Sequence, residues 1–131
     1  MVIDTSALLA LLFGEPEALA MATALAADSV RLVGAPTVVE AAAVMLARKG
    51  NAGEVALNAL FQRAGISVME MTPAAADAAR EGYARFGKGV GSPAVLNYGD
   101  CFAYGVAMTL GQPLLFKGDD FSRTDVVAVS Y

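Results

Sequence analysis

The sequence contains no histidine, and it has a single cysteine, Cys101. The lack of histidine excludes Ser-His-Asp and Cys-His hydrolases, histidine-based ribonucleases and nearly all zinc enzymes. One cysteine cannot form an intrachain disulfide, which fits a reducing cytoplasm. Any metal ion in this protein must therefore be held by oxygen atoms, and oxygen ligands favour magnesium, manganese or calcium.

Long hydrophobic runs are also missing. The longest apolar runs, such as ALAMATALAA and AAAVMLA, are shorter than the roughly 18 residues that a membrane-spanning helix needs. No basic stretch precedes an apolar one at the N-terminus, where Asp4 interrupts the apolar residues, so we expect no signal peptide. These features predict a cytoplasmic protein that does not associate with membranes.

The composition is apolar and acidic. The chain of 131 residues is 56% hydrophobic and 17% charged, with a net charge of −4. This length suggests one domain, residues 1–131, and the apolar excess suggests surface left over for a partner. A negative net charge argues against a nucleic-acid-binding protein, unless several acids share a metal site, because a bound cation reverses the local field.

Short apolar segments alternate with helical ones along the chain. Strands are expected at 2–4, 31–35, 66–71, 113–116 and 126–129. Helices are expected at 6–14, 15–28, 37–50, 51–65, 72–87 and 98–111. This alternation predicts an α/β fold with a parallel sheet covered on both faces. In such sheets, ligands bind beyond the carboxyl ends of the strands.

Acidic residues occur where that edge is expected. Asp4 ends the first strand, and Glu40 and Asp100 lie in the first turns of two helices. Asp119 and Asp120 directly follow the strand at 113–116. Two carboxylates about 4 Å apart repel by about 4 kcal/mol at an effective dielectric constant of 20. We therefore expect a converging set of these acids to hold a cation such as Mg²⁺.

Most of these acids also have a purely structural interpretation. Glu40 fits a capping box with Thr37, and Asp100 lies three residues after Asn97, where it can serve a helix N-terminus. The acids of the Gly-Asp-Asp segment fit a turn. Asp4 is the exception, because nothing about a strand end after two core residues asks for a carboxylate. Both interpretations stay open for the other acids.

Four segments, which follow one another along the chain, are distinctive when they are taken together: MVIDTSALLALLFGEPEA, PTVVEAAAVMLARKG, LNYGDCFAYGVA and LLFKGDDFSRTDV. Together they resemble the PIN-domain ribonucleases, and within them the VapC-type toxins of bacterial toxin–antitoxin modules. The resemblance covers nearly the whole chain. It implies a single PIN domain over residues 1–131, folded as an α/β/α sandwich around a mainly parallel sheet of four to five strands.

The resemblance also implies a function and a site. It implies a metal-dependent endoribonuclease in which Asp4, Glu40, Asp100 and Asp119 are catalytic and hold Mg²⁺ or Mn²⁺. Asp4 and Asp100 are taken as the main ligands, and Asp119 is chosen over Asp120 as the fourth acid. The implied partners are an RNA substrate, a second copy in a homodimer, and a VapB-like antitoxin that inserts a C-terminal segment beside the site.

Other interpretations compete with this one. A response-regulator receiver also binds magnesium and has a lysine after a late strand, as Lys117 is here. Receivers need adjacent acids after the first strand, whereas Asp4 is followed by Thr5 and Ser6. A haloacid dehalogenase-type phosphatase needs an Asp where this chain has Ser6. The remaining alternative is a non-catalytic PIN-like domain that only binds RNA or a protein, which the set of four acids argues against.

Overall fold

A four-stranded parallel sheet forms the centre of the computed structural model, which describes residues 1–91 and 93–131. Strands β1 (Val2–Ile3), β2 (Leu32–Gly34), β3 (Ser67–Met69) and β4 (Leu114–Leu115) lie in the order β3-β2-β1-β4. All three pairings are parallel. The expected parallel sheet is therefore confirmed, with its carboxyl ends along one edge.

The expected strand at 126–129 is reduced to a single bridge. Ala128 pairs with Leu114 in parallel, and the Leu114 backbone N–H donates to the Val127 carbonyl at 2.8 Å. The Val129 N–H donates to the Leu114 carbonyl at 2.9 Å. Because the partner strand β4 is only two residues long, the segment has little edge along which to extend the sheet.

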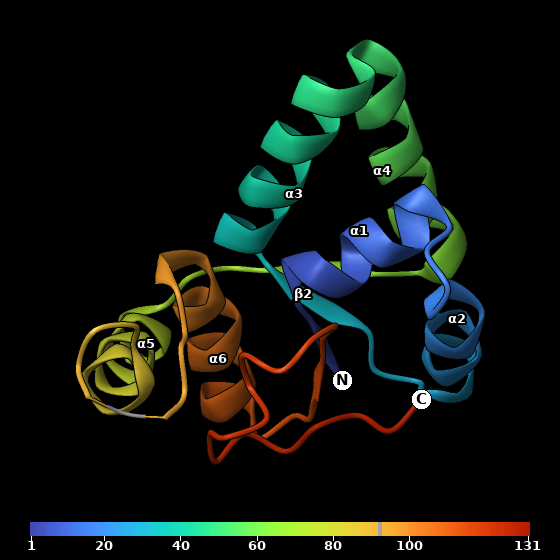
Figure 1. Ribbon diagram of the computed structural model, residues 1–131. Helices are drawn as coiled ribbons and strands as arrows, with labels where there is room; N and C mark the ends of the chain where they lie inside the picture. The colour runs from blue at the N-terminus through green and yellow to red at the C-terminus, as the bar shows by residue number, and fades with distance from the viewer. Residues whose placement is uncertain (92) are drawn as a thin grey trace.

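Six helices surround the sheet in the described residues. They are α1 (Thr5–Phe13), α2 (Ala18–Ala27), α3 (Ala35–Lys49), α4 (Asn51–Ala64), α5 (Pro73–Phe86) and α6 (Tyr98–Leu110). In Figure 1, α5 and α6 lie to the left of the strands, α1 and α2 lie to the right, and α3 and α4 form a pair rising above them. None of these helices is by itself long and apolar enough to cross a membrane.

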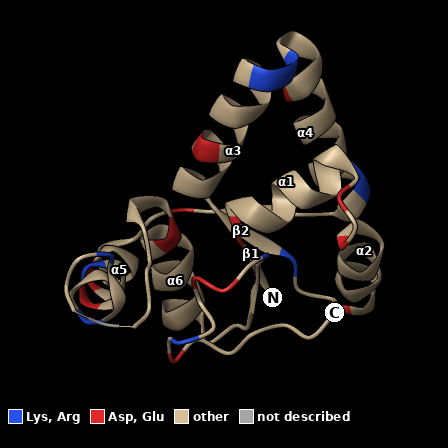
Figure 2. Cartoon of the chain, viewed as in Figure 1, with Lys and Arg blue, Asp and Glu red and all other residues tan. Residues whose placement is uncertain are grey.

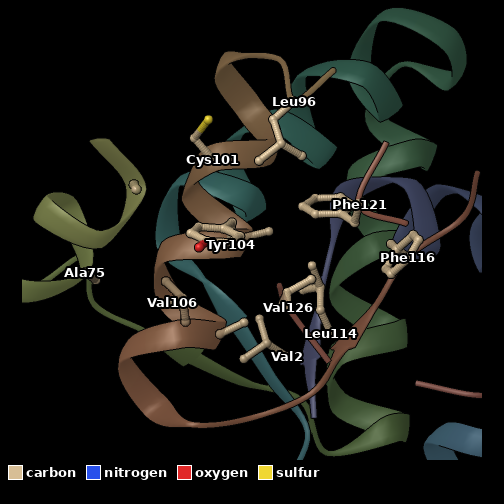
Figure 3. Packing of buried hydrophobic residues seen from close by; sticks show 13 residues of the cluster. Val2, Ala75, Leu96, Cys101, Tyr104, Val106, Leu114, Phe116, Phe121 and Val126 are labelled. Atoms are coloured by element: carbon tan, nitrogen blue, oxygen red, sulfur yellow. The ribbon is translucent and has the colours of Figure 1, made fainter. Parts of the chain in front are cut away.

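The sheet separates two hydrophobic clusters, which makes the fold an α/β/α sandwich. Successive residues of a strand point to opposite faces. Val2 and Leu114 accordingly pack with α5 and α6 in one cluster, which Figure 3 shows from close by. Ile3 and Leu115 pack with residues of α1, α2, α3 and α4 in the other. Two adjacent apolar residues in each short strand are thus enough to supply both cores.

Two helices begin earlier than the sequence predicts. Helix α1 begins at Thr5, with Asp4 as its N-cap. Helix α3 begins at Ala35, with Gly34 as its N-cap, so Thr37 lies inside the helix. The Pro in the second position of α3 is compatible with a first turn, where the backbone N–H groups have no helical partners. These two shifts change the interpretation of the acids that follow.

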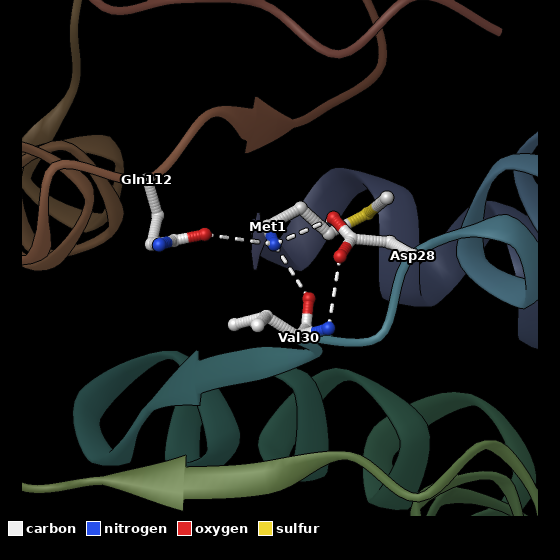
Figure 4. Close-up of polar contacts among 4 residues, drawn as sticks. All are labelled: Met1, Asp28, Val30 and Gln112. Atoms are coloured by element: carbon white, nitrogen blue, oxygen red, sulfur yellow. Dashed lines mark hydrogen bonds and ion pairs between the residues drawn. The ribbon is translucent and has the colours of Figure 1, made fainter.

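The N-terminal ammonium group is tied to both neighbours of β1 (Figure 4). The Met1 nitrogen donates to Asp28 Oδ2 at 2.8 Å, to the Val30 carbonyl at 2.5 Å and to Gln112 Oε1 at 3.2 Å. Hydrogen bonding to this ammonium group lowers the pKa of Asp28. Val30 precedes β2 and Gln112 precedes β4, so these contacts hold the start of β1 in register between the two strands.

Helices α5 and α6 approach each other closely because glycines lie at their contact. A Cβ atom on Gly82 of α5 would stand 2.5 Å from the Tyr104 ring of α6. A Cβ atom on Gly105 would stand 2.4 Å from the Ala75 carbonyl oxygen. The Tyr104 ring is 2% exposed and lies edge-on to Phe86 at 6.0 Å between centroids. It therefore has little room to give way.

We expect Gly82→Ala to destabilise the protein by about 1–3 kcal/mol, the usual cost of overpacking a core. Glu81→Ala, at the exposed neighbouring position of the same helix, should change the free energy of unfolding by less than about 0.5 kcal/mol. Urea unfolding of both variants measures the difference. Equal stability of Gly82→Ala and wild type would show that the Tyr104 ring can move.

Candidate functional site

Asp4 lies at the carboxyl end of β1 and is 3% exposed. Its Oδ2 accepts hydrogen bonds from the Ser6 backbone N–H at 2.9 Å and from the Ser6 hydroxyl at 2.6 Å. Asp4 thus caps α1. The expectation that nothing local asks for an acid here is therefore wrong, because the helix begins one residue earlier than predicted.

Capping does not remove the cost of this buried charge. Burial raises the pKa of Asp4, the Ser6 hydrogen bonds oppose that rise, and the charge of Glu40 adds to it. The Ser6 hydroxyl also accepts the Lys117 backbone N–H at 2.9 Å. Ser6 therefore links the end of β1 to the segment after β4, two places that the sequence separates by more than a hundred residues.

Glu40 lies in the second turn of α3, not at its start. The capping box with Thr37 is therefore wrong, because α3 begins at Ala35. The Thr5 hydroxyl donates to Glu40 Oε2 at 2.5 Å. A Cβ atom on Gly99 would stand 2.4 Å from Glu40 Oε1. The carboxylate of Glu40 consequently lies between the starts of α1 and α6, and the approach to α6 requires a glycine there.

Asp100 serves the start of α6, as its structural interpretation predicts. Its backbone N–H donates to Asn97 Oδ1 at 3.0 Å, and its own Oδ2 accepts the Asn97 N–H at 2.7 Å. This capping box does not prevent a second role. Burial raises the pKa of Asp100, the Asn97 hydrogen bond opposes that rise, and the charges of Asp4, Asp120 and Glu40 add to it, so that the pKa is about 6.

The two acids after β4 have different surroundings. Asp119 is exposed, and its backbone carbonyl accepts the N–H and the hydroxyl of Ser122 at 3.0 and 2.6 Å. Asp120 is partly buried, and its charge is one of those that raise the pKa of Asp100. Asp120 is therefore an acid of this segment whose charge acts on Asp100. The assignment of Asp119 to the site stays a prediction.

The acids share one edge of the sheet without forming a closed cage. Within residues 1–91 and 93–131, no three acid or cysteine side chains stand close enough to hold a metal ion. In Figure 2 the red segments of α3, of α6 and beside β1 lie around the centre of the molecule, blue segments mark the joined ends of α3 and α4, and α5 carries both colours.

No positive side chain balances these acids in the part of the chain that the structure describes. The ion pairs found there involve other acids. Lys117, close in sequence, pairs with Glu15 and Glu17 at 2.5 and 3.0 Å. Partly buried, mutually repelling carboxylates suit a hard divalent cation, which prefers oxygen ligands. The donor set therefore fits a metal such as Mg²⁺ in its chemistry.

Sequence reasoning missed the residues that hold the acids in place. No contact with an acid was predicted for Thr5, Ser6 or Gly99. Their signal in the sequence is proximity, since each lies within two residues of an acid. A separate apolar cavity of about 550 Å³ between α5 and α6, lined by residues such as Met71, Tyr98 and Phe102, includes none of the acids. It is therefore not the candidate site.

Comparison with known proteins gives consistent results. The family model described as PIN domain matches residues 1–127. VapC ribonuclease Mb0640 of Mycobacterium bovis and ribonuclease VapC30 of Mycobacterium tuberculosis are each 47% identical to the chain, over 99% of its length and 98% of theirs. Ribonuclease VapC of Mycolicibacterium smegmatis is 47% identical over 98% of this chain and 99% of its own.

Two solved structures have the same fold. Mycobacterium tuberculosis VapC20, described as a Sarcin-Ricin loop cleaving toxin, superimposes with a TM-score of 0.78 at 20% identity, covering 98% of this chain and 97% of its own. VapBC2 from Rickettsia felis, bound to a DNA fragment from its promoter, gives a TM-score of 0.78 at 11% identity and covers 98% and 96%. These likenesses concern the fold alone.

The pKa of Asp100 predicts a pH dependence of stability in metal-free protein. The folded state keeps a proton up to about pH 6, whereas an unfolded Asp releases it near 3.8. Because the native state binds more protons in this interval, the free energy of unfolding should fall as the pH rises from about 4 to about 6. Asp100→Asn, which keeps an acceptor for the Asn97 N–H, should weaken that fall.

Urea unfolding in EDTA at several pH values measures this effect. Asp77→Asn, at an exposed acid of α5, is the matched control and should keep the wild-type slope. Identical slopes for wild type and Asp100→Asn would contradict the assigned environment of Asp100.

Proposed function

The chain belongs to the PIN-domain family, and on this premise we propose that it is a divalent-metal-dependent endoribonuclease acting as the toxin of a toxin–antitoxin pair. Its 47% identity to ribonucleases of the VapC type supports this function. Family membership also removes the receiver-like interpretation. The single observation that carries the proposal is the group of acids at one sheet edge. Burial and the charges of the neighbouring acids raise the pKa of Asp100, and no positive side chain pairs with these acids among the described residues.

The proposed cofactor is Mg²⁺ or Mn²⁺. Asp4 and Asp100 would be its main ligands, because both are buried and both carry a raised pKa. A divalent cation supplies charge neutralisation at a scissile phosphate and lowers the pKa of a water molecule. The absence of histidine from the sequence is consistent with a reaction in which carboxylates alone hold the ion and handle protons.

The other acids would act on the attacking water. In the proposed reaction, water attacks the phosphorus in line, the bond to the 3′-oxygen breaks, and a proton passes to that oxygen. The products then carry 5′-phosphate and 3′-hydroxyl ends. Glu40, held by the Thr5 hydroxyl, and Asp120 would orient the water and accept its proton. We choose Asp120 over Asp119 because its charge acts on Asp100.

The proposed partners follow from the same premise. RNA is the substrate, and a net charge of −4 would repel it unless the cation offsets the acids. We propose a VapB-like antitoxin, since a structural neighbour is a VapBC2 complex. We also propose a homodimer, because Leu19, Val39, Val55 and Tyr98 are 68–81% exposed. An RNA-cleaving bacterial toxin of this kind would act in the cytoplasm.

Cleavage should require the metal and Asp4. We expect EDTA to abolish RNA cleavage and Mg²⁺ or Mn²⁺ to restore it. Asp4→Asn keeps a good N-cap for α1 but removes a repelling charge, so metal-free protein should melt no lower than wild type. Cleavage should fall by about a hundredfold or more, and stabilisation by Mg²⁺ should shrink.

Thermal melts with and without EDTA, beside a cleavage assay on single-stranded RNA, measure these effects, with Asp77→Asn as control. Full cleavage in EDTA would contradict the proposed mechanism. An Asp4→Asn variant that melts well below wild type yet cuts RNA normally would show that Asp4 is only a cap. Wild type that binds the metal and RNA without cutting would favour the non-catalytic PIN-like alternative.

The fourth acid can be identified with a matched pair of variants. Asp120→Asn should reduce the rate of cleavage by about 10–100-fold, the range seen when groups supporting a metal site are lost. Asp119→Asn, one residue away and exposed, should stay within about twofold of wild type. Single-turnover cleavage at saturating Mg²⁺ measures both rates. The opposite ranking would restore the assignment of Asp119.

A further inference from the structure

The segment that carries Asp120 is held at both ends and in its middle. We call residues 117–125, between β4 and the C-terminal bridge, the acid loop. At its start, the Lys117 N–H donates to the Ser6 hydroxyl at 2.9 Å. In its middle, Phe121 is 3% exposed, with its ring centroid 4.9 Å from that of Phe116. At its end, Asp125 binds two helices. The loop is therefore built in place by its neighbours.

The carboxylate of Asp125 joins α5, α6 and the acid loop. Its Oδ1 accepts the Tyr104 hydroxyl at 2.7 Å, and its Oδ2 lies 2.7 Å from an Arg85 guanidinium nitrogen. Burial opposes the ionisation of Asp125, but these two donors lower its pKa overall. The Arg85 guanidinium in turn lies 4.5 Å from the centroid of the Phe86 ring. A single side chain thus fixes the loop to both helices.

Tyr104 is the rigid member of this junction. Arg85 and Asp125 are 45% and 40% exposed, so their ion pair is screened by solvent and contributes modestly. Tyr104 is 2% exposed, and its ring is confined by Gly82 and Phe86. A buried hydroxyl without a hydrogen-bond partner is costly. The hydrogen bond from the Tyr104 hydroxyl therefore favours the observed position of Asp125.

Tyr104 also lies on the helix that presents Asp100. The two residues are four positions apart on α6, which places them on the same side of the helix one turn apart. The hydroxyl of Tyr104 therefore sets the distance of the acid loop from the same helix that positions Asp100. Asp120 lies in the loop between the buried Phe121 and the Lys117 anchor.

We propose that Tyr104 is a positioning residue for RNA cleavage, which acts through Asp125 to hold the acid loop so that Asp120 stands beside Asp100. This inference rests on the proposed function. Tyr104 touches neither RNA nor metal in this scheme. Loss of its hydroxyl leaves every candidate acid in the chain but removes the buried partner of Asp125, so the end of the acid loop keeps only the exposed ion pair with Arg85 and Asp120 is held less firmly.

A double-mutant cycle between Tyr104→Phe and Asp120→Asn tests the proposal. Tyr104→Phe should lower kcat about tenfold, the smaller effect expected of a supporting group, and leave the KM for RNA within about twofold, since uniform binding is retained. If Tyr104 acts through Asp120, the double variant should be no slower than Asp120→Asn alone. If the effects of the two substitutions on kcat multiply in the double variant, Tyr104 has a merely structural role and the proposal is overturned.

Binding of Mn²⁺ without RNA provides a second readout. The electron paramagnetic resonance signal of free Mn²⁺ gives the Kd of each variant. We expect Tyr104→Phe to raise the Kd for Mn²⁺ in the otherwise wild-type protein. In the double variant, the Kd should be no higher than that of Asp120→Asn alone. A Tyr104→Phe variant with the wild-type Kd and the wild-type kcat would also overturn the proposal.

Two controls distinguish this inference from a general loss of stability and from a failure of the proposed function. Ile66→Val, in the hydrophobic cluster on the opposite face of the sheet, should lower the melting temperature without changing kcat or the Mn²⁺ Kd, so loss of stability alone is controlled. Wild type that cleaves no RNA would overturn the proposed function, while the Mn²⁺ cycle would still decide whether Tyr104 and Asp120 are coupled.

Discussion

Repulsion between carboxylates at one edge of the sheet is the constraint on which the site depends. Asp4 and Asp100 are nearly buried, and burial together with the neighbouring charges raises the pKa of both. Without a cation, the burial of these charges and their mutual repulsion lower the stability of the fold. Hydrogen bonds from Thr5, Ser6 and Asn97 hold Glu40, Asp4 and Asp100 in place, and this arrangement is the strongest argument that the site has a function.

The fold holds each acid by giving it a structural task as well. Asp4 caps α1, and Asp100 completes the capping box of α6. Glu40 accepts the Thr5 hydroxyl and lies against Gly99. A structural and a functional interpretation of the same acid are therefore compatible. A helix N-terminus orients a carboxylate through its own backbone N–H groups, and a carboxylate oriented in this way is also fixed in space for a ligand.

The contacts that fix the acids come from distant parts of the chain. Ser6 connects the end of β1 to the segment after β4, and Asp125 connects the acid loop to α5 and α6. The close packing of α5 on α6, which depends on Gly82 and Gly105, keeps Tyr104 in place. Helix α6 thus connects the hydrophobic core to the acidic edge of the sheet, because it carries both Tyr104 and Asp100.

The sequence alone determined the α/β class, the parallel sheet and the candidate acids at strand and helix ends, because alternating strands and helices place those ends on one edge. The sequence also predicted a helix from residue 72, and α5 has Thr72 as its N-cap and Pro73 as its first residue, both of which favour a helix start. Only the tertiary structure decided the starts of α1 and α3, since Asp4 and Gly34 become caps through the positions of β1 and β2. The tertiary structure also decided how the two adjacent acids after β4 differ, since Asp119 is exposed and Asp120 is partly buried. Neighbouring loop residues of the same type carry no sequence signal for this difference, because burial depends on contacts such as that between the rings of Phe116 and Phe121.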